Sequence, residues 1–375
     1  MFAVRALQPQ HHRTGSGHKL IPSHGRLTIQ THILLTGGTG YIGGSVLTRL
    51  LSHPHSDAFQ IVVLVRSPEK AHQFRKMGIK AVIGDLGNSS LLRELAGAVD
   101  VVFSCADADN LGSVKAILSG LKDHYERTGV VASLIHTSGT GVLMDDAQGM
   151  YASPTIYSDM DVPQLESLPS SQPHREVDLE IVNADKQGFV KTYIVLPGTI
   201  YGRASGPLVD LHVQNPRSQQ LPRLLEVSLD RGQGGMVGVG KNVWPCVHID
   251  DVADLYFTIF NSILSEGSSK QPGHGRSGFY FAENGEYTMY DLAKAVSSVL
   301  YQLGKGKDPK PTTFTEAEME KYFPSGTSLG TNSRCKGERA TGLGWKPEYR
   351  TKDLLESVRG EVDDTGEDNS SSSGE

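Results

Sequence analysis

A glycine-rich segment near the start of the chain, residues 36–43, has the residue types and spacing of a turn that binds phosphate groups. It reads Thr-Gly-Gly-Thr-Gly-Tyr-Ile-Gly. The apolar run 33–35 before it is typical of a buried strand, and residues 45–51 after it have the apolar spacing of a helix. Strand, glycine turn and helix in this order predict a site for the pyrophosphate of a dinucleotide. A glycine-rich loop without a ligand is the alternative interpretation.

Each glycine of this segment has a separate physical task. Gly37 permits the tight turn, and Gly40 lets backbone N–H groups approach the pyrophosphate. Gly43 lets the helix pack close to the strand. The helix N-terminus then faces the phosphates with unpaired N–H groups and the positive end of its dipole. The other residues of the turn that are predicted to contact the cofactor are Thr36, Thr39, Tyr41 and Ile42.

The end of the second predicted strand, residues 60–65, indicates which dinucleotide is bound. Enzymes that use NAD place an acidic residue there to accept hydrogen bonds from the adenosine ribose, whereas a basic residue favours the 2′-phosphate of NADP. Arg66 and Ser67 follow this strand, and no acid stands at the ribose position. We therefore expect NADP(H) in preference to NAD(H), with an ordinary surface arginine as the alternative interpretation of Arg66. Further cofactor contacts, after the third and fourth strands, are predicted for Asp85, Leu86, Cys105 and Ala106.

Apolar runs alternate with helical patterns from residue 32 to about residue 200. Most of the runs are continuously apolar, as expected of strands that are covered on both faces. This alternation is typical of a doubly wound parallel sheet, the Rossmann form of the α/β class, whose ligands bind outside the carboxyl ends of the strands. The predicted strands are residues 32–36, 60–65, 80–83, 100–104, 131–136 and 192–196, with helices between them, for example at 91–96 and 114–125.

The chain divides into four regions by composition. Residues 1–31 contain no acidic residue, as in a mitochondrial transit peptide, but proline and glycine interrupt any amphipathic helix, so we expect a disordered extension. Residues 32–202 are predicted to form the dinucleotide-binding domain. Residues 203–358 are predicted to form a smaller substrate domain, of which the segment 243–262 is interleaved with the first domain. Residues 359–375, acidic and rich in serine, are expected to form a disordered tail.

Composition restricts the classes of function. The chain has 375 residues and a formal net charge of −6, which fits a soluble globular protein and gives no support for nucleic-acid binding. No apolar run reaches the roughly 18 residues that a membrane helix needs. The three cysteines lie far apart, without the spacing of a zinc site. We therefore expect a reducing, cytoplasmic location and no metal site.

The motifs together resemble the extended short-chain dehydrogenase/reductase superfamily, and within it the atypical epimerase/dehydratase-like proteins. The resemblance covers roughly residues 32–358 and depends on the order and spacing of several segments. Residues 343–347 also resemble the end of sugar-nucleotide epimerase-like chains. The other segments that carry the resemblance are residues 36–43, 84–86, 136–139, 196–202 and 247–253.

The resemblance implies roles for residues near the expected nicotinamide. Ser138 matches the serine that hydrogen-bonds the substrate carbonyl or hydroxyl, and Pro197 and Gly198 match the segment beside the nicotinamide. The main acid/base of the superfamily is a tyrosine followed four residues later by a lysine, whose charge lowers the tyrosine pKa. This pair is absent from the helix before the sixth strand, where the chain has His174 and Asp178.

His174 and Asp178 are the predicted substitutes for that pair. Positions i and i+4 share a helix face, and a carboxylate beside an imidazole raises the histidine pKa. His174 would then donate a proton to a carbonyl oxygen, with Asp178 orienting it or binding the ribose. A polar helix N-terminus that faces water is the alternative interpretation. Tyr157, in the preceding loop, is an alternative proton donor without a lysine partner.

Two functions are consistent with these observations. The first is an NADP(H)-dependent oxidoreductase of the epimerase/dehydratase-like type that acts on a small aldehyde, ketone or alcohol with an atypical acid/base pair. The second is an NADP(H)-binding sensor or regulatory pseudoenzyme with little turnover, which the missing Tyr/Lys pair favours. The expected partners are a small-molecule substrate and a second copy of the chain, because homodimers are common in this superfamily. Nucleic acid and membranes are not expected.

Overall fold

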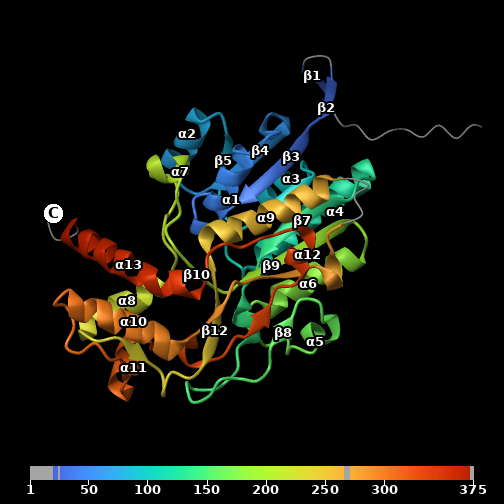
Figure 1. The fold of residues 1–375 in the computed structure, drawn as a ribbon. Helices are drawn as coiled ribbons and strands as arrows, with labels where there is room; N and C mark the ends of the chain where they lie inside the picture. Colours follow the sequence, from blue (N-terminus) through green and yellow to red (C-terminus); the bar gives the residue numbers. More distant parts are fainter. Residues whose placement is uncertain (1–19, 24–25, 266–270, 372–375) are drawn as a thin grey trace, which may run out of the picture.

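A seven-stranded sheet forms the centre of the structure (Figure 1). The computed structural model describes residues 20–23, 26–265 and 271–371. The strands are β3 (Thr31–Thr36), β4 (Phe59–Val65), β5 (Lys80–Ile83), β6 (Val101–Ser104), β7 (Ala132–Thr137), β9 (Val190–Pro197) and β13 (Phe279–Ala282). Their order is β13-β9-β7-β6-β3-β4-β5, and every neighbouring pair is parallel. The strand order reverses between β3 and β6, which is where such sheets bind their ligands.

Helices cover both faces of this sheet. One face packs against α1 (Tyr41–Leu51), α2 (Pro68–Lys76), α9 (Ile249–Leu264) and α12 (Arg339–Leu343), and the other against α3 (Ser89–Ala96), α4 (Leu111–Thr128) and α6 (Arg175–Lys186). Along β3, Ile33 and Leu35 join the first core and Leu34 joins the second, and all three are fully buried. Each such side chain contributes roughly 1.5–3 kcal/mol on burial. The predicted doubly wound α/β class is confirmed.

A smaller part, built mostly from residues after 203, has its own apolar core, in which Leu224, Trp244 and Val296 are buried. Its helices are α8 (Gln220–Arg231), α10 (Met289–Gln302), α11 (Glu316–Tyr322) and α13 (Thr351–Ser371). Its strands are β10 (Thr199–Tyr201), β12 (Val243–His248) and β14 (Glu286–Thr288) in one sheet, and β11 (Gly235–Met236) paired with β15 (Thr312–Thr313). A short strand, β8 (Tyr157–Ser158), pairs with β16 (Cys335–Lys336). Two short helices are α5 (Val162–Glu166) and α7 (Pro207–Asp210). Short 3₁₀ helices lie at Ser56–Ala58, Thr140–Leu143, Gly275–Ser277 and Ser328–Gly330.

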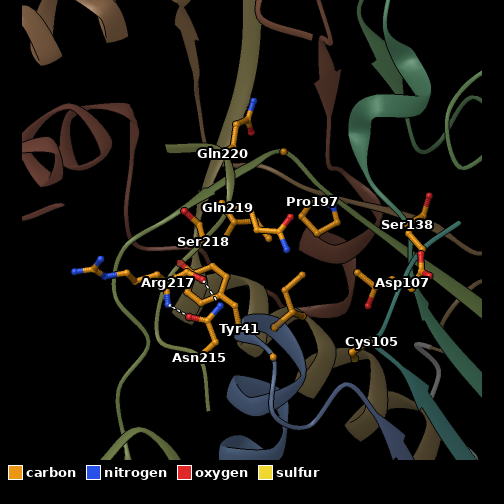
Figure 2. A pocket seen from close by; sticks show the side chains of 16 residues that line it. Tyr41, Cys105, Asp107, Ser138, Pro197, Asn215, Arg217, Ser218, Gln219 and Gln220 are labelled. Carbon is orange, nitrogen blue, oxygen red and sulfur yellow. Dashed lines mark hydrogen bonds between the residues drawn. The ribbon is translucent and has the colours of Figure 1, made fainter. Parts of the chain in front are cut away.

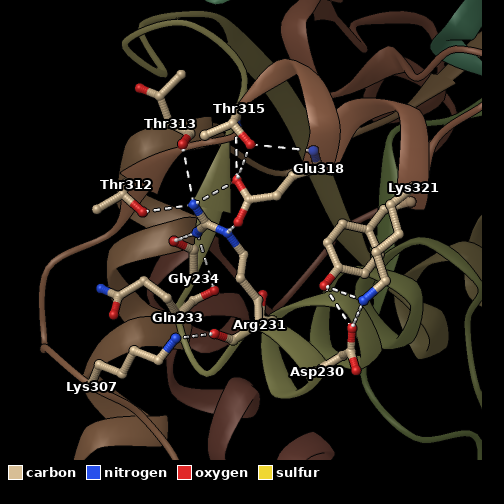
Figure 3. A network of polar contacts seen from close by, with 12 residues as sticks. Asp230, Arg231, Gln233, Gly234, Lys307, Thr312, Thr313, Thr315, Glu318 and Lys321 are labelled. Atoms are coloured by element: carbon tan, nitrogen blue, oxygen red, sulfur yellow. Dashed lines mark hydrogen bonds and ion pairs between the residues drawn. The ribbon is translucent and has the colours of Figure 1, made fainter.

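Arg231, at the end of α8, joins several elements of the smaller part (Figure 3). Its guanidinium donates to both carboxylate oxygens of Glu318 on α11, at 2.6 and 3.2 Å, and to Oγ1 of Thr312 on β15 at 2.8 Å. The hydrogen bond from Arg231 is the largest reason why the pKa of Glu318 is lowered to about 2. Charge-assisted bidentate pairs are among the strongest hydrogen bonds in proteins. The network therefore fixes α8, whose first residue, Gln220, borders a cavity described below.

Two segments near the C-terminal end of the chain, β13 and α12, pack in the central part of the structure. β13 extends the main sheet beside β9, although the sequence placed only the segment 243–262 of the later chain there. α12 packs against α9, and the Nε1 of Trp345, just after α12, donates to the backbone carbonyl of Asp251 at 2.9 Å. β13 and α12 are only four and five residues long, and elements this short carry no periodicity that tells which sheet they join.

Both ends of the described chain carry more regular structure than predicted. β1 (Leu20–Ser23) and β2 (Arg26–Ile29) pair antiparallel within the segment expected to be disordered. At the other end, α13 continues to Ser371, past the predicted boundary at 358. Leu354, Val358 and Val362 recur at helical spacing and are fully buried, so packing extends the helix into the acidic segment. Residues 1–19 and 372–375, also predicted to be disordered, lie outside the described residues.

Candidate active site

Two adjoining cavities lie at the carboxyl ends of the central strands. One, here called the Ser138 cavity, has a volume of about 660 Å³, and the other, the Arg66 cavity, has a volume of about 640 Å³. The residues that line both cavities are Gly40, Cys105, Asp107 and Gln219. The two spaces therefore meet at the glycine turn, between the ends of β3 and β6.

The predicted cofactor residues gather around these cavities. Those lining the Arg66 cavity are Thr36, Gly37, Thr39, Gly40, Arg66, Asp85, Leu86, Cys105 and Ala106. Those lining the Ser138 cavity are Gly40, Tyr41, Ile42, Cys105, Pro197 and Gly198. Gly43 and Ser67 lie outside both linings. The structure thus brings together residues from five strand ends that are far apart in the sequence.

The glycine turn has the geometry that its sequence predicted. Gly37 has φ +77°, and a Cβ at this position would lie 2.7 Å from the carbonyl oxygen of Cys105. A Cβ at Gly43 would lie 2.3 Å from the carbonyl oxygen of Gly37, so the helix can approach the turn only without a side chain there. Gly40 stands at the N-cap of α1, and no side chain among the described residues caps this helix. The N-terminus of α1 is thus without a side-chain cap, as the predicted phosphate site requires.

The Arg66 cavity follows directly from the ends of β4 and β5. Arg66 is the first residue after β4, and Asp85 lies in the turn after β5, where its Oδ1 accepts a hydrogen bond from the Gly87 backbone at 2.8 Å. Ser67 has a different task, because its Oγ accepts a hydrogen bond from the backbone N–H of Lys70 at 3.2 Å and caps α2. Ser67 therefore caps α2, and its contact with the cofactor stays a prediction.

Ser138 and Asp178 form a buried pair at the wall of the Ser138 cavity. Ser138 follows β7 and donates from Oγ to Oδ2 of Asp178 at 3.2 Å. The two residues are 6% and 0% exposed, and the other carboxylate oxygen of Asp178 has no hydrogen-bond partner among the described residues. Burial, which disfavours the ionised form, raises the pKa of Asp178 to about 7 against the opposing effect of the Ser138 hydrogen bond.

The predicted contact between His174 and Asp178 is wrong. His174 precedes α6 with φ 66°, in the left-handed region, so its side chain does not lie on the helix stripe that carries Asp178. Its Nδ1 lies 2.8 Å from a carboxylate oxygen of Asp109, in the loop after β6. Its ring lies beside Gly139 and Gly141, where an added Cβ would come within 3.2 Å of Nε2. His174 therefore packs against the turn after Ser138 and lines neither cavity.

Tyr157 and Tyr41 do not supply the missing acid/base tyrosine. Tyr157, the alternative proton donor, lies in β8, pairs with β16 at Cys335 and lines neither cavity. Tyr41 lines the Ser138 cavity, but its hydroxyl donates to the backbone carbonyl of Gly202, and burial raises its pKa well above the usual value. Among the described residues, no lysine lines either cavity. The structure thus offers no substitute Tyr/Lys pair at this position.

A segment after β10, residues 214–220, lines one side of the Ser138 cavity; the sequence placed it in the predicted substrate domain but singled out none of its residues as a site residue. Gln214 Nε2 donates to the backbone carbonyl of Tyr41 at 3.1 Å and to Oγ of Ser45 at 3.0 Å, which fastens the segment to α1. In Figure 2 its side chains and Tyr41 gather on one side of the cavity, with Ser138 on the other. The residues of this segment that line the cavity are Asn215, Arg217, Ser218, Gln219 and Gln220. A stretch without apolar periodicity gives no sequence signal for such a contact.

Asp107 is a second lining residue that the sequence did not indicate. It follows β6 in the left-handed region, with φ 50°, and borders both cavities. Its Oδ1 accepts a hydrogen bond from the backbone of Asp109 at 3.4 Å. An aspartate tolerates this backbone conformation better than most residues, and the turn lies directly beyond the predicted contacts Cys105 and Ala106. The position of Asp107 immediately after Ala106 is the sequence signal that could have indicated it.

No group of three or more His, Cys, Asp or Glu side chains in the described part could hold a metal ion. Within the same ranges, no helix is both long and apolar enough to cross a membrane.

Sequence comparison identifies relatives along most of the chain. Residues 33–270 match the family model described as NAD dependent epimerase/dehydratase family. The oxidase ucsJ of Acremonium sp is 31% identical over 334 residues, covering 84% of this chain and 92% of the oxidase. An uncharacterized protein of Saccharomyces cerevisiae is 26% identical over 346 residues, covering 87% of this chain and 97% of the yeast protein.

Solved structures share the fold at low sequence identity. A UDP-glucose 4-epimerase of Thermotoga maritima, solved with UDP-glucose, has a TM-score of 0.59 and 15% identity, covering 88% of this chain and 97% of the epimerase. A dTDP-glucose 4,6-dehydratase of Streptomyces venezuelae, solved with NAD, has a TM-score of 0.60 and 18% identity, covering 87% of this chain and 95% of the dehydratase. At such identities the likeness concerns the fold alone.

Proposed function

Because the chain belongs to the NAD dependent epimerase/dehydratase family, we propose that it is an NADP(H)-dependent oxidoreductase that acts on a small aldehyde, ketone or alcohol. The observation that carries this proposal is the pair of adjoining cavities, with Arg66 at one and Ser138 at the other. A dinucleotide binds across the point where the strand order of a Rossmann sheet reverses. Its adenosine half would occupy the Arg66 cavity, and its nicotinamide half would enter the Ser138 cavity.

The residues present fit such a cofactor. Gly37 and Gly43 leave no room for side chains at the turn, which keeps the N-terminus of α1 open to a pyrophosphate. Pro197 and Gly198, at the end of β9, would border the nicotinamide, which supplies or accepts a hydride when bound. Ser138 Oγ would donate a hydrogen bond to the substrate oxygen and so orient the carbonyl.

The preference for NADP rests on Arg66. A guanidinium favours the 2′-phosphate of NADP and gives no acceptor to the free ribose hydroxyls of NAD. Asp85 is an acidic residue of the Arg66 cavity, but it follows β5 and not β4. Its Oδ1 already accepts a hydrogen bond from the Gly87 backbone. A basic residue after β4, without an acidic residue there, supports NADP in this proposal.

The lining of the Ser138 cavity favours a small substrate over a sugar nucleotide. A diphosphate requires several basic groups, and Arg217 is the one basic residue among the described side chains of this lining. The remaining polar side chains are hydroxyls, amides and the Asp107 carboxylate, beside the apolar Ile42, Pro197 and Ile200. Such a surface suits an uncharged carbonyl compound.

A sensor that binds NADP(H) with little turnover is the second candidate. The observation in its favour is that, within the described lining residues, Tyr41 is the one tyrosine and its hydroxyl is engaged with Gly202, while lysine is absent. Cofactor binding alone would then change the protein or a partner. The two candidates share the cofactor and differ only in turnover.

For either candidate we propose a cytoplasmic location. Cys105, Cys246 and Cys335 are free thiols. Unpaired cysteines are usual in reducing compartments.

One experiment separates these functions. NADPH and NADH are each titrated into purified protein by calorimetry, and NADPH oxidation is followed by absorbance with a panel of aldehydes and ketones. The oxidoreductase predicts tighter binding of NADPH and turnover on at least one carbonyl. Tight binding without turnover on any compound would support the sensor, preference for NADH would contradict the assignment of Arg66, and absence of binding would overturn both candidates.

A further inference from the structure

We propose that Asp178 supplies the proton for the substrate oxygen and that Ser138 passes this proton on. The two residues would take the place of the absent Tyr/Lys pair. The inference rests on the proposed function, because it concerns the reduction of a carbonyl in the Ser138 cavity. Asp178 does not touch the substrate and acts through Ser138, so it is a positioning and proton-holding residue. It was expected to orient His174 or to bind the ribose; in the structure it accepts a hydrogen bond from Ser138, and His174 contacts Asp109.

The geometry places Asp178 directly behind the reacting position. Ser138 borders the cavity, and its Oγ is 3.2 Å from Oδ2 of Asp178, which is fully buried. Among the described residues this is the only hydrogen bond that the Asp178 carboxyl group makes, since Oδ1 has no partner. A buried carboxylate with a single hydrogen bond is costly, whereas a protonated carboxyl is not. The protonated form can donate to Ser138.

The charged and titratable groups facing Asp178 come from three elements. Arg175, on α6 itself, lowers the Asp178 pKa, as does the hydrogen bond from Ser138 after β7. Asp109, in the loop after β6, raises it, but burial is the largest cause, and the resulting pKa is about 7. His136, at the end of β7, has its pKa lowered to about 4 by burial and is neutral near pH 7. Asp178 can therefore exchange its proton near neutral pH, which a general acid requires.

The proton transfers balance as follows for the reducing direction. When the carbonyl carbon has accepted a hydride, its oxygen needs a proton. The Ser138 O–H bond breaks to supply it, and the Asp178 Oδ2–H bond breaks to restore the serine hydroxyl. The product is an alcohol, Ser138 is unchanged, and Asp178 is a carboxylate that takes a new proton from solvent. Alcohol oxidation runs through the same groups in reverse.

Other groups near Ser138 are excluded by their contacts. His174 is paired with Asp109 and lines neither cavity. The hydroxyl of Tyr41 donates to the Gly202 carbonyl. Arg175 donates to the backbone carbonyl of Leu165 at 3.1 Å and does not titrate near neutral pH. Asp178 remains as the group that both contacts Ser138 and changes protonation in this range.

The test uses full-length protein and a carbonyl that the wild type reduces. Asp178→Asn keeps the size and a hydrogen bond to Ser138 but cannot pass on a proton. We expect kcat to fall about 10²- to 10⁴-fold, the usual share of acid/base catalysis, with the NADPH Kd changed less than about twofold. The wild-type reduction rate should fall as pH rises through about 7, because the protonated carboxyl is required, and this dependence should vanish in the variant. Glu176→Gln, an exposed carboxyl in the same helical turn, is the matched control and should behave as wild type.

A second readout needs neither cofactor nor turnover. Infrared difference spectra of the cofactor-free protein should contain the carbonyl stretch of a protonated, buried carboxyl at pH 5 and lose it by pH 9. Asp159, whose pKa burial raises to about 6, contributes to this band in all variants, so the part that titrates near pH 7 is the one that should be absent from Asp178→Asn and present in Glu176→Gln. An active wild type with an equally active Asp178→Asn, or an unchanged infrared titration in that variant, overturns the inference alone. A wild type without turnover on any carbonyl overturns the proposed function and this inference with it.

Discussion

The two cavities differ in how the chain builds them. The Arg66 cavity is made almost entirely of residues that directly follow β3, β4, β5 and β6. The Ser138 cavity takes its lining from strand ends, from the loop at Asp107 and from the distant segment 214–220, with Asp178 on α6 behind it. The first keeps the arrangement that the superfamily resemblance implies, and the second departs from it. The proposed cofactor site and the proposed proton source thus lie in parts of the molecule that the chain builds differently.

The largest expected effect concerns the turn that the two cavities share. In Gly43→Ala the new Cβ would lie 2.3 Å from the Gly37 carbonyl oxygen, so α1 must move away from the turn. We expect NADPH affinity to fall at least about 100-fold, because both the helix N-terminus and the close backbone approach are lost. Calorimetric titration measures this.

The control for this variant is Gly342→Ala. Gly342 lies in α12, and an added Cβ meets no heavy atom within 4 Å. Its NADPH affinity should equal that of the wild type, and its melting temperature should be at least as high, because alanine favours a helix over glycine. Circular dichroism must show that Gly43→Ala is folded, and a folded Gly43→Ala that binds NADPH normally would contradict the role of the turn.

The next effect is confined to the Arg66 cavity. Arg66→Asp replaces a cation by a carboxylate that repels the 2′-phosphate and accepts hydrogen bonds from free ribose hydroxyls. We expect NADPH affinity to fall about 10- to 100-fold and NADH affinity to rise, because one charge-assisted contact is worth about 1.5–3 kcal/mol. Lys76→Asp, at the exposed end of α2, makes the same charge change away from both cavities and is the control. Equal loss in both variants would indicate a general electrostatic effect and no specific contact.

The same division explains what the sequence could predict. The parallel sheet and the Arg66 cavity followed from apolar runs and from the residue after each run, because parallel strands deliver their carboxyl ends to one edge. The hydrogen bond between Ser138 and Asp178 depends on where α6 begins. His174 has a left-handed backbone and lies before the helix, so it does not share a helix face with Asp178. The contact of Gln214 with α1 depends on a long connection without periodicity. Side-chain partners across such connections are set by packing, which local patterns do not encode.

A third prediction concerns stability at the Ser138 end. Because burial raises the Asp178 pKa from 3.8 to about 7, the folded state binds an additional proton between these values, and stability falls as pH rises through that window. Asn at this position carries no charge, so Asp178→Asn should be the more stable protein at pH 8 by on the order of 4 kcal/mol, with the advantage vanishing near pH 4. Thermal melts across pH 4–8 measure this, with Glu176→Gln as the control. A constant difference between variant and wild type across that window would argue against a titrating, buried carboxyl.

A smaller effect is expected at His174. Its ring pairs with Asp109 and packs beside Gly139 and Gly141, so it shapes the turn after Ser138 without lining a cavity. We expect His174→Phe to lower kcat about threefold through a displaced Ser138, since positional errors of this kind reduce the rate without removing a proton donor. The loss of reduction rate above about pH 7 should persist, because Asp178 is intact. A fall of 100-fold or more, with that pH dependence abolished, would restore His174 as the acid.

The smallest effect is expected at Tyr157, which the sequence offered as an alternative proton donor. Tyr157 pairs in β8 with Cys335 in β16 and lies outside both cavity linings. Removing its hydroxyl in Tyr157→Phe should leave kcat, KM and the NADPH Kd within about twofold of wild type, because no proton passes through it and exposed or peripheral substitutions cost little. Steady-state kinetics on the same carbonyl measure this. A tenfold loss of kcat in a folded Tyr157→Phe would mean that β8 moves to the Ser138 cavity during turnover, and the proton source would then belong to that strand instead of α6.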